Sequence, residues 1–380
     1  MLFYLVKQLQ PWLDANGLGF LRVFTFVTFQ STVAILLGFS LVLLLGPRVI
    51  DWLRRQKIGD RPEFDQAEIN ALMEGKKGTP TMGGVIIISS IAITTLLVAN
   101  LGNFYVRMAL VCLIWLGGVG AVDDWLKLTA ARRGGSRQGL SGIEKLLFQI
   151  GLGLILSFFT YRYGRNLSAA VHFYFPFFKD YALPLGLGLF MLIGTVVLVG
   201  SSNAVNLTDG LDGLASGCMA IVSFAFFVLA LIVGIQELAN YLLLPHIEAG
   251  GQMAVIAGAM TGACLGFLWF NCNPARVFMG DTGSLALGGL IGYISIVIRQ
   301  ELMLFLVGGI FVAEAVSVML QVGYFKYTRK RYGEGRRIFL MSPLHHHFQR
   351  KGWTETQVVV RFWCIGAMLA VMALVTVKLR

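Results

Sequence analysis

Ten apolar segments of helical length divide this chain, and they constrain its fold more than any other feature. A membrane-spanning helix needs about 20 mainly apolar residues, because lipid offers its backbone no hydrogen-bond partners. Only 13% of the residues are charged, about half the share in soluble proteins. The sequence therefore predicts an all-α integral membrane protein with about ten transmembrane helices, in one domain over residues 1–380. The segments run approximately over 23–46, 83–101, 106–123, 143–161, 183–201, 212–235, 250–270, 284–298, 302–325 and 358–377.

The positions of Lys and Arg predict how these helices are oriented. If the loop after the first segment is cytoplasmic, 22 of the 31 basic residues lie in or beside cytoplasmic segments. The positive-inside rule then places both termini outside and five loops inside. The same bias explains the net charge of +11, although attraction of phosphates and anionic lipid heads is a second explanation. The predicted cytoplasmic loops are approximately 47–82, 123–145, 201–212, 271–284 and 326–357.

Carboxylates border the apolar segments in three of these loops. Asp123 and Asp124 end the third segment, and Asp281 precedes the eighth. A carboxylate beside hydrocarbon is costly, which favours a function for it. The adjacent Asp123 and Asp124 repel each other and usually need a metal or a cation to stay ionised. Lys127 could supply that cation or bind a phosphate, or the cluster could be a charged helix end that pairs with Lys127.

Four polar residues recur every three positions between the fifth and sixth segments, namely Asn203, Asn206, Asp209 and Asp212. On an α-helix this spacing rotates by about 60° per step, which spreads the groups, whereas a 3₁₀ or loop geometry keeps them together. Asn amides can read a base or a sugar, and Asp can bind a metal or a ribose hydroxyl. The alternative is a polar loop that caps the two flanking helices.

The segment from Asn271 to Ser284 opens the eighth apolar segment. Asp281 and Thr282 could simply cap that helix. Alternatively, backbone N–H groups at the glycine-rich helix start could hold phosphate, and Asp281 could bind Mg²⁺. Phe278 could stack on a base or be interfacial.

Further polar residues lie near the same predicted face. Lys76 and Thr81 offer charge and a hydroxyl for a diphosphate, or belong to a solvated turn, and Lys145 starts the fourth segment. Glu314 and Gln321 fall on one polar stripe of the ninth segment. Gln321 is the better site candidate because it is nearer the cytoplasmic end.

The triplet His345–His347 is a poor zinc motif, because consecutive side chains point in different directions and no Cys lies near. One of these histidines could bind or protonate a phosphate while the others pack. The five cysteines show no CxxC spacing, so neither a disulfide nor a zinc site is expected. Residues 1–16 show no cleavable signal peptide and are expected to lie along the membrane interface.

The stretches 79–84, 123–127, 203–215, 278–288 and 343–348 resemble the signature loops of the polyprenyl-phosphate N-acetylhexosamine-1-phosphate transferases. Residues 203–215 and 343–348 are most similar to the phospho-N-acetylmuramoyl-pentapeptide-transferase family within that superfamily. The resemblance covers nearly the whole chain, including about ten spans with external termini. The chain departs from the family pattern in one respect, since segments 128–142 and 326–342 are somewhat longer. The first of these precedes Lys145 and therefore affects how Lys145 is matched to the family position.

This resemblance implies a Mg²⁺-dependent transferase whose active site faces the cytoplasm from the bacterial inner membrane. UDP-N-acetylmuramoyl-pentapeptide and undecaprenyl phosphate would give lipid I and UMP in peptidoglycan biosynthesis. A homodimer is suggested by the resemblance alone, membrane lipid surrounds the chain, and no nucleic-acid partner is expected.

The resemblance also implies roles for individual positions. It places metal binding on Asp281, and catalysis on Asp123, Asp124, Asp281 and His345. Uracil would lie near Asp212 and Phe278. The positions implied to bind substrate are Lys76, Thr81, Lys127, Lys145, Asn203, Asn206, Asp209, Asp212, Phe278, Gly280, Gln321 and His346.

Two alternative functions stay open from the residues themselves. A relative that uses UDP-N-acetylglucosamine is disfavoured by the triple-histidine loop. An ion-coupled transporter usually places its acids at the membrane midplane within inverted repeats, and Glu314 is the main feature of that kind here.

Overall fold

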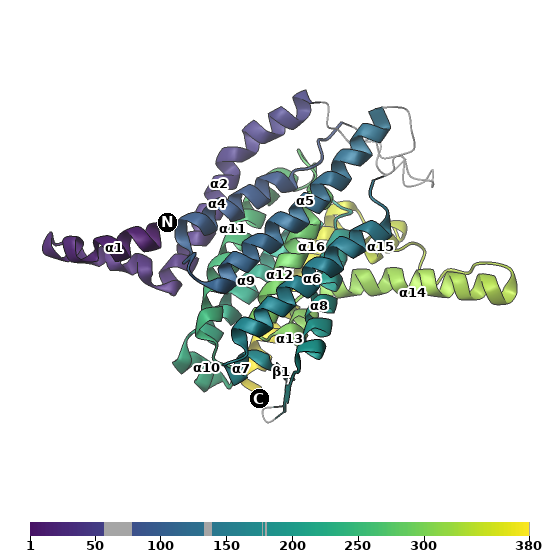
Figure 1. Ribbon diagram of the computed structural model, residues 1–380. Helices are drawn as coiled ribbons and strands as arrows, with labels where there is room; N and C mark the ends of the chain where they lie inside the picture. Colours follow the sequence, from purple (N-terminus) through teal and green to yellow (C-terminus); the bar gives the residue numbers. More distant parts are fainter. Residues whose placement is uncertain (57–77, 133–138, 177, 179–180, 380) are drawn as a thin grey trace.

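The computed structural model describes residues 1–56, 78–132, 139–176, 178 and 181–379, and these form a bundle of long helices (Figure 1). Within this part of the chain, nine helices are long and apolar enough to cross a membrane. A tenth, α4, is shorter and occupies the place of the predicted segment 83–101. The helices of the bundle are α2 (Val27–Arg55), α4 (Gly84–Val98), α5 (Phe104–Arg132), α6 (Gly142–Gly164), α8 (Leu187–Thr208), α9 (Leu214–Gly234), α11 (Met253–Asn271), α12 (Gly280–Val297), α14 (Gly309–Tyr332) and α16 (Glu355–Thr376).

Short elements connect these helices or flank them. β1 and β2 pair antiparallel with Phe173 opposite Leu183 and form a short hairpin. Helix α1 extends away from the bundle, as Figure 1 shows. The short elements are α1 (Leu2–Ala15), η1 (Gly19–Thr25), α7 (Ser168–Val171), β1 (His172–Tyr174), β2 (Ala182–Pro184), α10 (Gln236–Leu242), η3 (Glu248–Gln252), α13 (Glu301–Val307), α15 (Leu344–Arg350) and η4 (Val377–Leu379).

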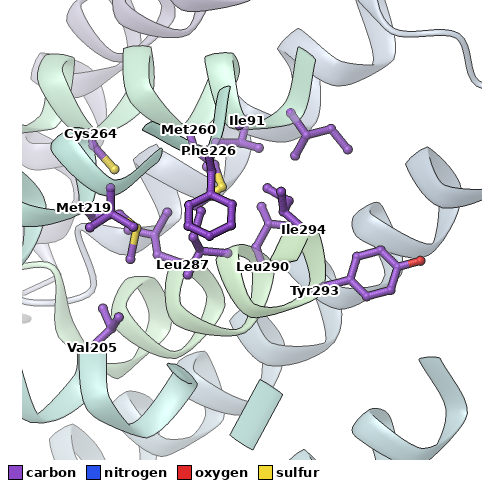
Figure 2. Packing of buried hydrophobic residues seen from close by; sticks show 14 of the residues in the cluster. Ile91, Val205, Met219, Phe226, Met260, Cys264, Leu287, Leu290, Tyr293 and Ile294 are labelled. Carbon is purple, nitrogen blue, oxygen red and sulfur yellow. The ribbon is translucent and has the colours of Figure 1, made fainter. Parts of the chain in front are cut away.

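Helix α12 is the central helix of the bundle, with 89% of its apolar window buried. It packs against α5 on one side and α8 on another. Figure 2 shows Leu287 and Leu290 of α12 beside Phe226 of α9 and Met260 of α11. Since lipid tails are as apolar as these side chains, close packing rather than escape from water holds such helices together. The N-terminal end of α12 is thereby fixed at the centre of one end of the bundle.

Helices α2 and α11 approach each other through small residues. Gly258, Gly262 and Gly266 recur every four positions on α11, and a Cβ at any of them would meet the backbone of α2. A Cβ on Gly262 would overlap the carbonyl oxygen of Ile35. This spacing of small residues is the arrangement by which membrane helices bring their backbones together.

Several helices continue past the ends of the predicted apolar segments. Helix α5 runs nine residues beyond Asp123, and α8 runs to Thr208, so Asp123, Asp124, Asn203 and Asn206 lie on helices rather than in loops. The predicted segment 302–325 is divided at Gly308 into α13 and α14. Helix α14 then extends out of the bundle to Tyr332 (Figure 1). Hydropathy finds where apolar residues stop, whereas α5 and α8 continue because their polar side chains have partners inside the protein.

Candidate active site

Three carboxylates from two helices meet at the N-terminal end of α12. Asp123 and Asp124 of α5 and Asp281 of α12 each offer an oxygen, and these oxygens lie within 4.8 Å of one another. Asp123 and Asp124 are buried, while Asp281 is half-buried. A group of carboxylate oxygens this close can hold a divalent metal ion. Acids that lie far apart in the sequence thus come together, and the candidate metal site is wider than the Asp281 that the resemblance implies.

Two lysines neutralise this cluster. The Nζ atom of Lys145 lies 2.7 Å from Oδ2 of Asp123 and 2.7 Å from Oδ2 of Asp281. The Nζ atom of Lys127 lies 2.6 Å and 3.0 Å from the same two oxygens. Both ammonium groups are partly exposed, so they can also contact an anion that enters from outside. Lys145 therefore joins the site despite the long preceding segment.

Asp124 has different surroundings from Asp123 although the two are adjacent. Its carboxylate accepts hydrogen bonds from the backbone N–H of Thr282 at 3.0 Å and of Asp281 at 3.2 Å. It also accepts one from Oγ1 of Thr282 at 2.7 Å. The first N–H groups of a helix have no partner within that helix, and a carboxylate placed there is stabilised by the helix dipole. Asp124 thus caps α12 from a neighbouring helix, which corrects the alternative in which Asp281 and Thr282 cap it themselves.

Asn203 and Asn206 both lie on α8, and the helix spreads them apart as the three-residue spacing predicts for α geometry. The Nδ2 atom of Asn206 donates to Oδ1 of Asp281 at 2.8 Å and to Oγ of Ser284 at 2.9 Å. The Nδ2 atom of Asn203 instead donates to Oε1 of Gln149 on α6 at 2.7 Å. Asn206 therefore orients a site carboxylate, whereas Asn203 links two helices beside it.

Asp209 follows the last residue of α8 and lies close to the carboxylate cluster. Burial raises the pKa of Asp209 to about 7, and the negative charges of Asp281 and Asp124 act in the same direction. A hydrogen bond from the backbone N–H of Gly280 partly opposes this shift. Any cation that enters the site would favour the ionised form of Asp209.

The segment before α4 runs beside the start of α12. The N–H of Phe278 donates to the carbonyl of Pro80, and the N–H of Gly83 donates to the carbonyl of Phe278, each at 2.8 Å. This pairing brings Thr81 to the site, because a Cβ on Gly280 would lie 3.0 Å from Oγ1 of Thr81. Lys76, which the sequence predicts to bind substrate, lies outside the described residues.

Asp212 joins the loop after α8 to the loop after α11. Its Oδ2 accepts hydrogen bonds from Nδ2 of Asn273 at 3.1 Å and from the N–H of Ala275 at 3.0 Å. Asn271 strengthens the same junction, since its Oδ1 accepts from the N–H of Gly213 at 3.1 Å. Phe278, half-buried, follows in this second loop. The two loops predicted to be on the nucleotide side are therefore hydrogen-bonded into one surface.

The three histidines of α15 have three different environments. Nδ1 of His345 lies 3.2 Å from Oε2 of Glu314, and both side chains are buried. Nδ1 of His346 lies 2.8 Å from Oε1 of Gln349. Nδ1 of His347 accepts from the N–H of Leu340 at 3.1 Å, and burial followed by the charge of Lys351 lowers the pKa of His347. The three rings thus lie beside three different groups, namely Glu314, Gln349 and the N–H of Leu340.

Gln321 organises the loop that leads to those histidines. Its Oε1 accepts hydrogen bonds from the N–H groups of Ile338 and Phe339, each at 3.0 Å. The structure thus shows Gln321 holding the loop backbone.

Three residues near the site were missed by the sequence analysis. Gln149 bonds Asn203, Glu355 accepts from the N–H of Asp212 at 2.8 Å, and the N–H of Leu140 donates to Asp123 at 2.7 Å. Gln149 lies one helical turn after Lys145, which is a signal that the helix periodicity could have supplied. Glu355 and Leu140 carry no such signal, because their contacts join segments far apart in sequence.

The fold and the site together define a polytopic membrane protein with an acidic, lysine-lined centre at one end of its helix bundle. Residues 106–299 match the family model described as glycosyl transferase family 4. Residues 76–88 match signature 1 of phospho-N-acetylmuramoyl-pentapeptide-transferases. The chain is also 46% identical over 362 residues to a phospho-N-acetylmuramoyl-pentapeptide-transferase of Desulfotalea psychrophila (strain LSv54 / DSM 12343), covering 94% of this chain and 96% of that protein. The chain belongs to glycosyl transferase family 4 and, within it, to the phospho-N-acetylmuramoyl-pentapeptide-transferases.

Proposed function

We propose that this chain transfers phospho-N-acetylmuramoyl-pentapeptide from its UDP derivative to undecaprenyl phosphate, which gives lipid I and UMP. The observation that carries this proposal is the carboxylate cluster of Asp123, Asp124 and Asp281 with Lys127 and Lys145 at its edge. Two anionic phosphates must approach each other in such a reaction, so fixed positive charge beside them is what the chemistry needs. The family membership supplies the substrate class.

The metal that fits this cluster best is Mg²⁺. Its donors are carboxylate oxygens, and a hard ion that prefers oxygen ligands suits them. Asp281 would hold the ion, with Asp123 and Asp124 close enough to take part. A bound Mg²⁺ supplies positive charge that stabilises the departing nucleotide phosphate.

Individual residues of the chain would have separate roles in the reaction. Asp123 would deprotonate or orient the phosphate of the lipid, whose oxygen attacks the β-phosphorus of the nucleotide as the bond to the UMP oxygen breaks. Lys127 and Lys145 would contact the reacting phosphates, and Asn206 would keep Asp281 oriented. Asp209, Asp212, Phe278 and Gly280 would line the nucleotide side, with Thr81 beside them.

An apolar cavity beside α8 suits part of the tail of the lipid carrier. Its volume is about 220 Å³, and it lies between α8, α12 and the α13–α14 pair. Ala204 and Val205 line it, and they lie on α8 between Asn203 and Asn206. A prenyl chain in this cavity would keep its phosphate next to the carboxylates.

We further propose that the site faces the cytoplasm from the bacterial inner membrane, with both termini outside. This orientation follows from the distribution of Lys and Arg. A homodimer stays a prediction from the family resemblance.

The test of this proposal is UMP release by the purified chain in detergent with undecaprenyl phosphate and Mg²⁺. We expect UMP with UDP-N-acetylmuramoyl-pentapeptide and none with UDP-N-acetylglucosamine. EDTA or Asp281→Asn should reduce kcat by about 10³-fold, because the charge that stabilises the transition state is lost. UMP release only with UDP-N-acetylglucosamine would mean that this nucleotide is the donor substrate instead. UMP release with neither nucleotide, in folded protein, would refute the transferase assignment.

The competing mechanism uses an aspartate as a nucleophile and forms a covalent sugar-phosphate on the protein. Incubation with the nucleotide donor alone, followed by mass spectrometry of the intact chain, separates the two. A covalent adduct on Asp123 would overturn the one-step mechanism, and UMP release that requires the lipid acceptor would support it.

A further inference from the structure

Glu314 and His345 form a buried polar pair that the proposed reaction does not use. Glu314 is fully buried on α14, and the His345 side chain on α15 is 1% exposed. Oε1 of Glu314 accepts a hydrogen bond from the backbone N–H of His345 at 3.2 Å, and Oε2 lies 3.2 Å from Nδ1 of the same residue. Glu314 thus holds the backbone of His345 and lies beside its ring. A buried carboxylate is costly, so its place beside His345 points to a specific task.

The other edge of the His345 ring meets the loop after α8. A Cβ built on Gly210 would overlap Nε2 of His345 and would lie 3.0 Å from its Cε1. Gly210 stands between Asp209 and Asp212. The ring therefore fills the space between α14 and the backbone of this loop. No substrate atom can reach the ring without displacing the loop, because the side chain is closed on both sides.

Helix α14 holds the segment that carries His345 at two points. Gln321 binds the backbone of Ile338 and Phe339, and Glu314 binds the backbone of His345 about two turns away along the helix. Because both ends of the segment are fixed to α14, the position of the His345 ring relative to Gly210 is fixed as well. The loop that contains Asp209 and Asp212 cannot then move toward α14.

We propose that His345 is a positioning residue, held by Glu314, that fixes the loop 209–213 and thereby sets the affinity for the nucleotide part of the donor. This inference rests on the proposed function, because it takes Asp209 and Asp212 to be on the nucleotide side. It replaces the predicted catalytic role of His345 with a mechanical one. Loss of the contact raises KM for the nucleotide and leaves kcat nearly unchanged.

The first test removes the hold of Glu314 on His345. Glu314→Leu leaves the backbone N–H of His345 without its buried acceptor and removes the carboxylate beside the ring, and we expect KM for the nucleotide donor to rise about 10-fold. Glu314→Gln keeps an acceptor for the N–H and should restore KM to within about 3-fold of the parent chain. In both variants kcat should stay within about 3-fold. A fall in kcat at constant KM would overturn the proposal.

The second test uses the contact between His345 and Gly210. Gly210→Ala should raise KM for the nucleotide about 10-fold, because the new methyl group displaces the loop. In a His345→Ala background there is room for that methyl group, so the same change should cost less than about 2-fold. Equal effects of Gly210→Ala in both backgrounds would show that the ring does not position the loop. Loss of kcat in His345→Ala with unchanged KM would show a chemical role instead.

Two further measurements separate this inference from folding and from the proposed function. Glu301→Gln is the matched control, because Glu301 is also a buried carboxylate, paired with Arg299 at 2.9 Å outside the site. It should lower the melting temperature in detergent without changing KM. Binding of UDP by calorimetry needs no reaction. No binding to the parent chain would count against the proposed function, whereas binding equally strong in Glu314→Leu would count against the inference alone.

Discussion

Asp123 and Asp124 stand next to each other in the sequence, yet their carboxylates have different partners. On a helix, adjacent residues point about 100° apart, so one side chain faces the lysines and the other faces the start of α12. Asp123 and Asp281 therefore share Lys127 and Lys145, and Asp281 is the more exposed of these two carboxylates. Asp124 holds α12 in place and keeps Asp281 within reach of its partners.

Gly280 allows the close approach that this arrangement requires. Its φ of 73° lies in the left-handed region, and a Cβ there would lie 2.6 Å from Oδ2 of Asp124. We expect Gly280→Ala to reduce kcat about 100-fold, because the start of α12 must shift away from Asp124. UMP release and the melting temperature in detergent would both be measured.

Gly333→Ala provides the control for backbone strain alone. Gly333 has a φ of 79°, and a Cβ there would meet nothing within 4 Å. Both variants carry the cost of a left-handed alanine, about 1 kcal/mol. If Gly333→Ala reduced activity as much as Gly280→Ala, the contact with Asp124 would not be the cause.

At the level of elements, the pair α2–α11 supports the end of the bundle where the site lies. Helix α11 leads through Asn271 into the loop that bonds Asp212, so a shift of α11 moves that loop. We expect Gly262→Leu to shorten the half-life of activity at elevated temperature about 10-fold, because its side chain would separate α11 from the backbone of Ile35. Residual UMP release after heating measures this.

The matched control for that change is Gly151→Leu on α6. A Cβ on Gly151 would meet nothing within 4 Å, so a larger side chain has room there. The half-life of activity of Gly151→Leu at elevated temperature should stay within about 2-fold of that of the parent chain. A similar loss in both variants would mean that any leucine in a membrane helix is harmful, and that close packing of α2 and α11 is not what matters.

Apolar runs predicted nearly all the helices, because lipid leaves the backbone few alternatives. The helix ends were harder to predict. Asp123 and Lys127 look like a loop by hydropathy, but the helix continues because their charges find partners across the bundle. The break at Gly308 and the course of α14 out of the bundle also have no clear local signal. Polar side chains with distant partners are what a hydropathy pattern cannot represent.

At the scale of the whole molecule, the site exists because the ends of several distant helices meet. The sequence indicated candidate residues for the site, since acids and amides beside hydrocarbon are unusual. Their pairing could not be predicted, because Lys145 and Asp281 are 136 residues apart and each had several candidate partners. The separation of Asn203 from Asn206 likewise depends on where α6 and α12 pack against α8.

The orientation of the molecule leads to a prediction about a native cysteine. Cys272 is exposed directly after α11, at the same end of the bundle as the carboxylates, whereas Cys112, Cys218 and Cys264 are buried. The fifth, Cys364, is exposed near the middle of α16 and is removed by Cys364→Ser. If the positive-inside rule holds here, a membrane-impermeant maleimide should label Cys272 in inside-out vesicles and leave it unlabelled in right-side-out vesicles.

Leu167→Cys reports on the opposite end of the bundle. Leu167 is 51% exposed just after α6, which starts near the site at Lys145 and ends away from it. In a background in which Cys272 and Cys364 are serine, it should be labelled only in right-side-out vesicles. If both labelling patterns were reversed, the site would face the outside of the cell, where a cytoplasmic nucleotide could not reach it. Labelling of both cysteines from one side would contradict the placement of these two positions at opposite membrane surfaces.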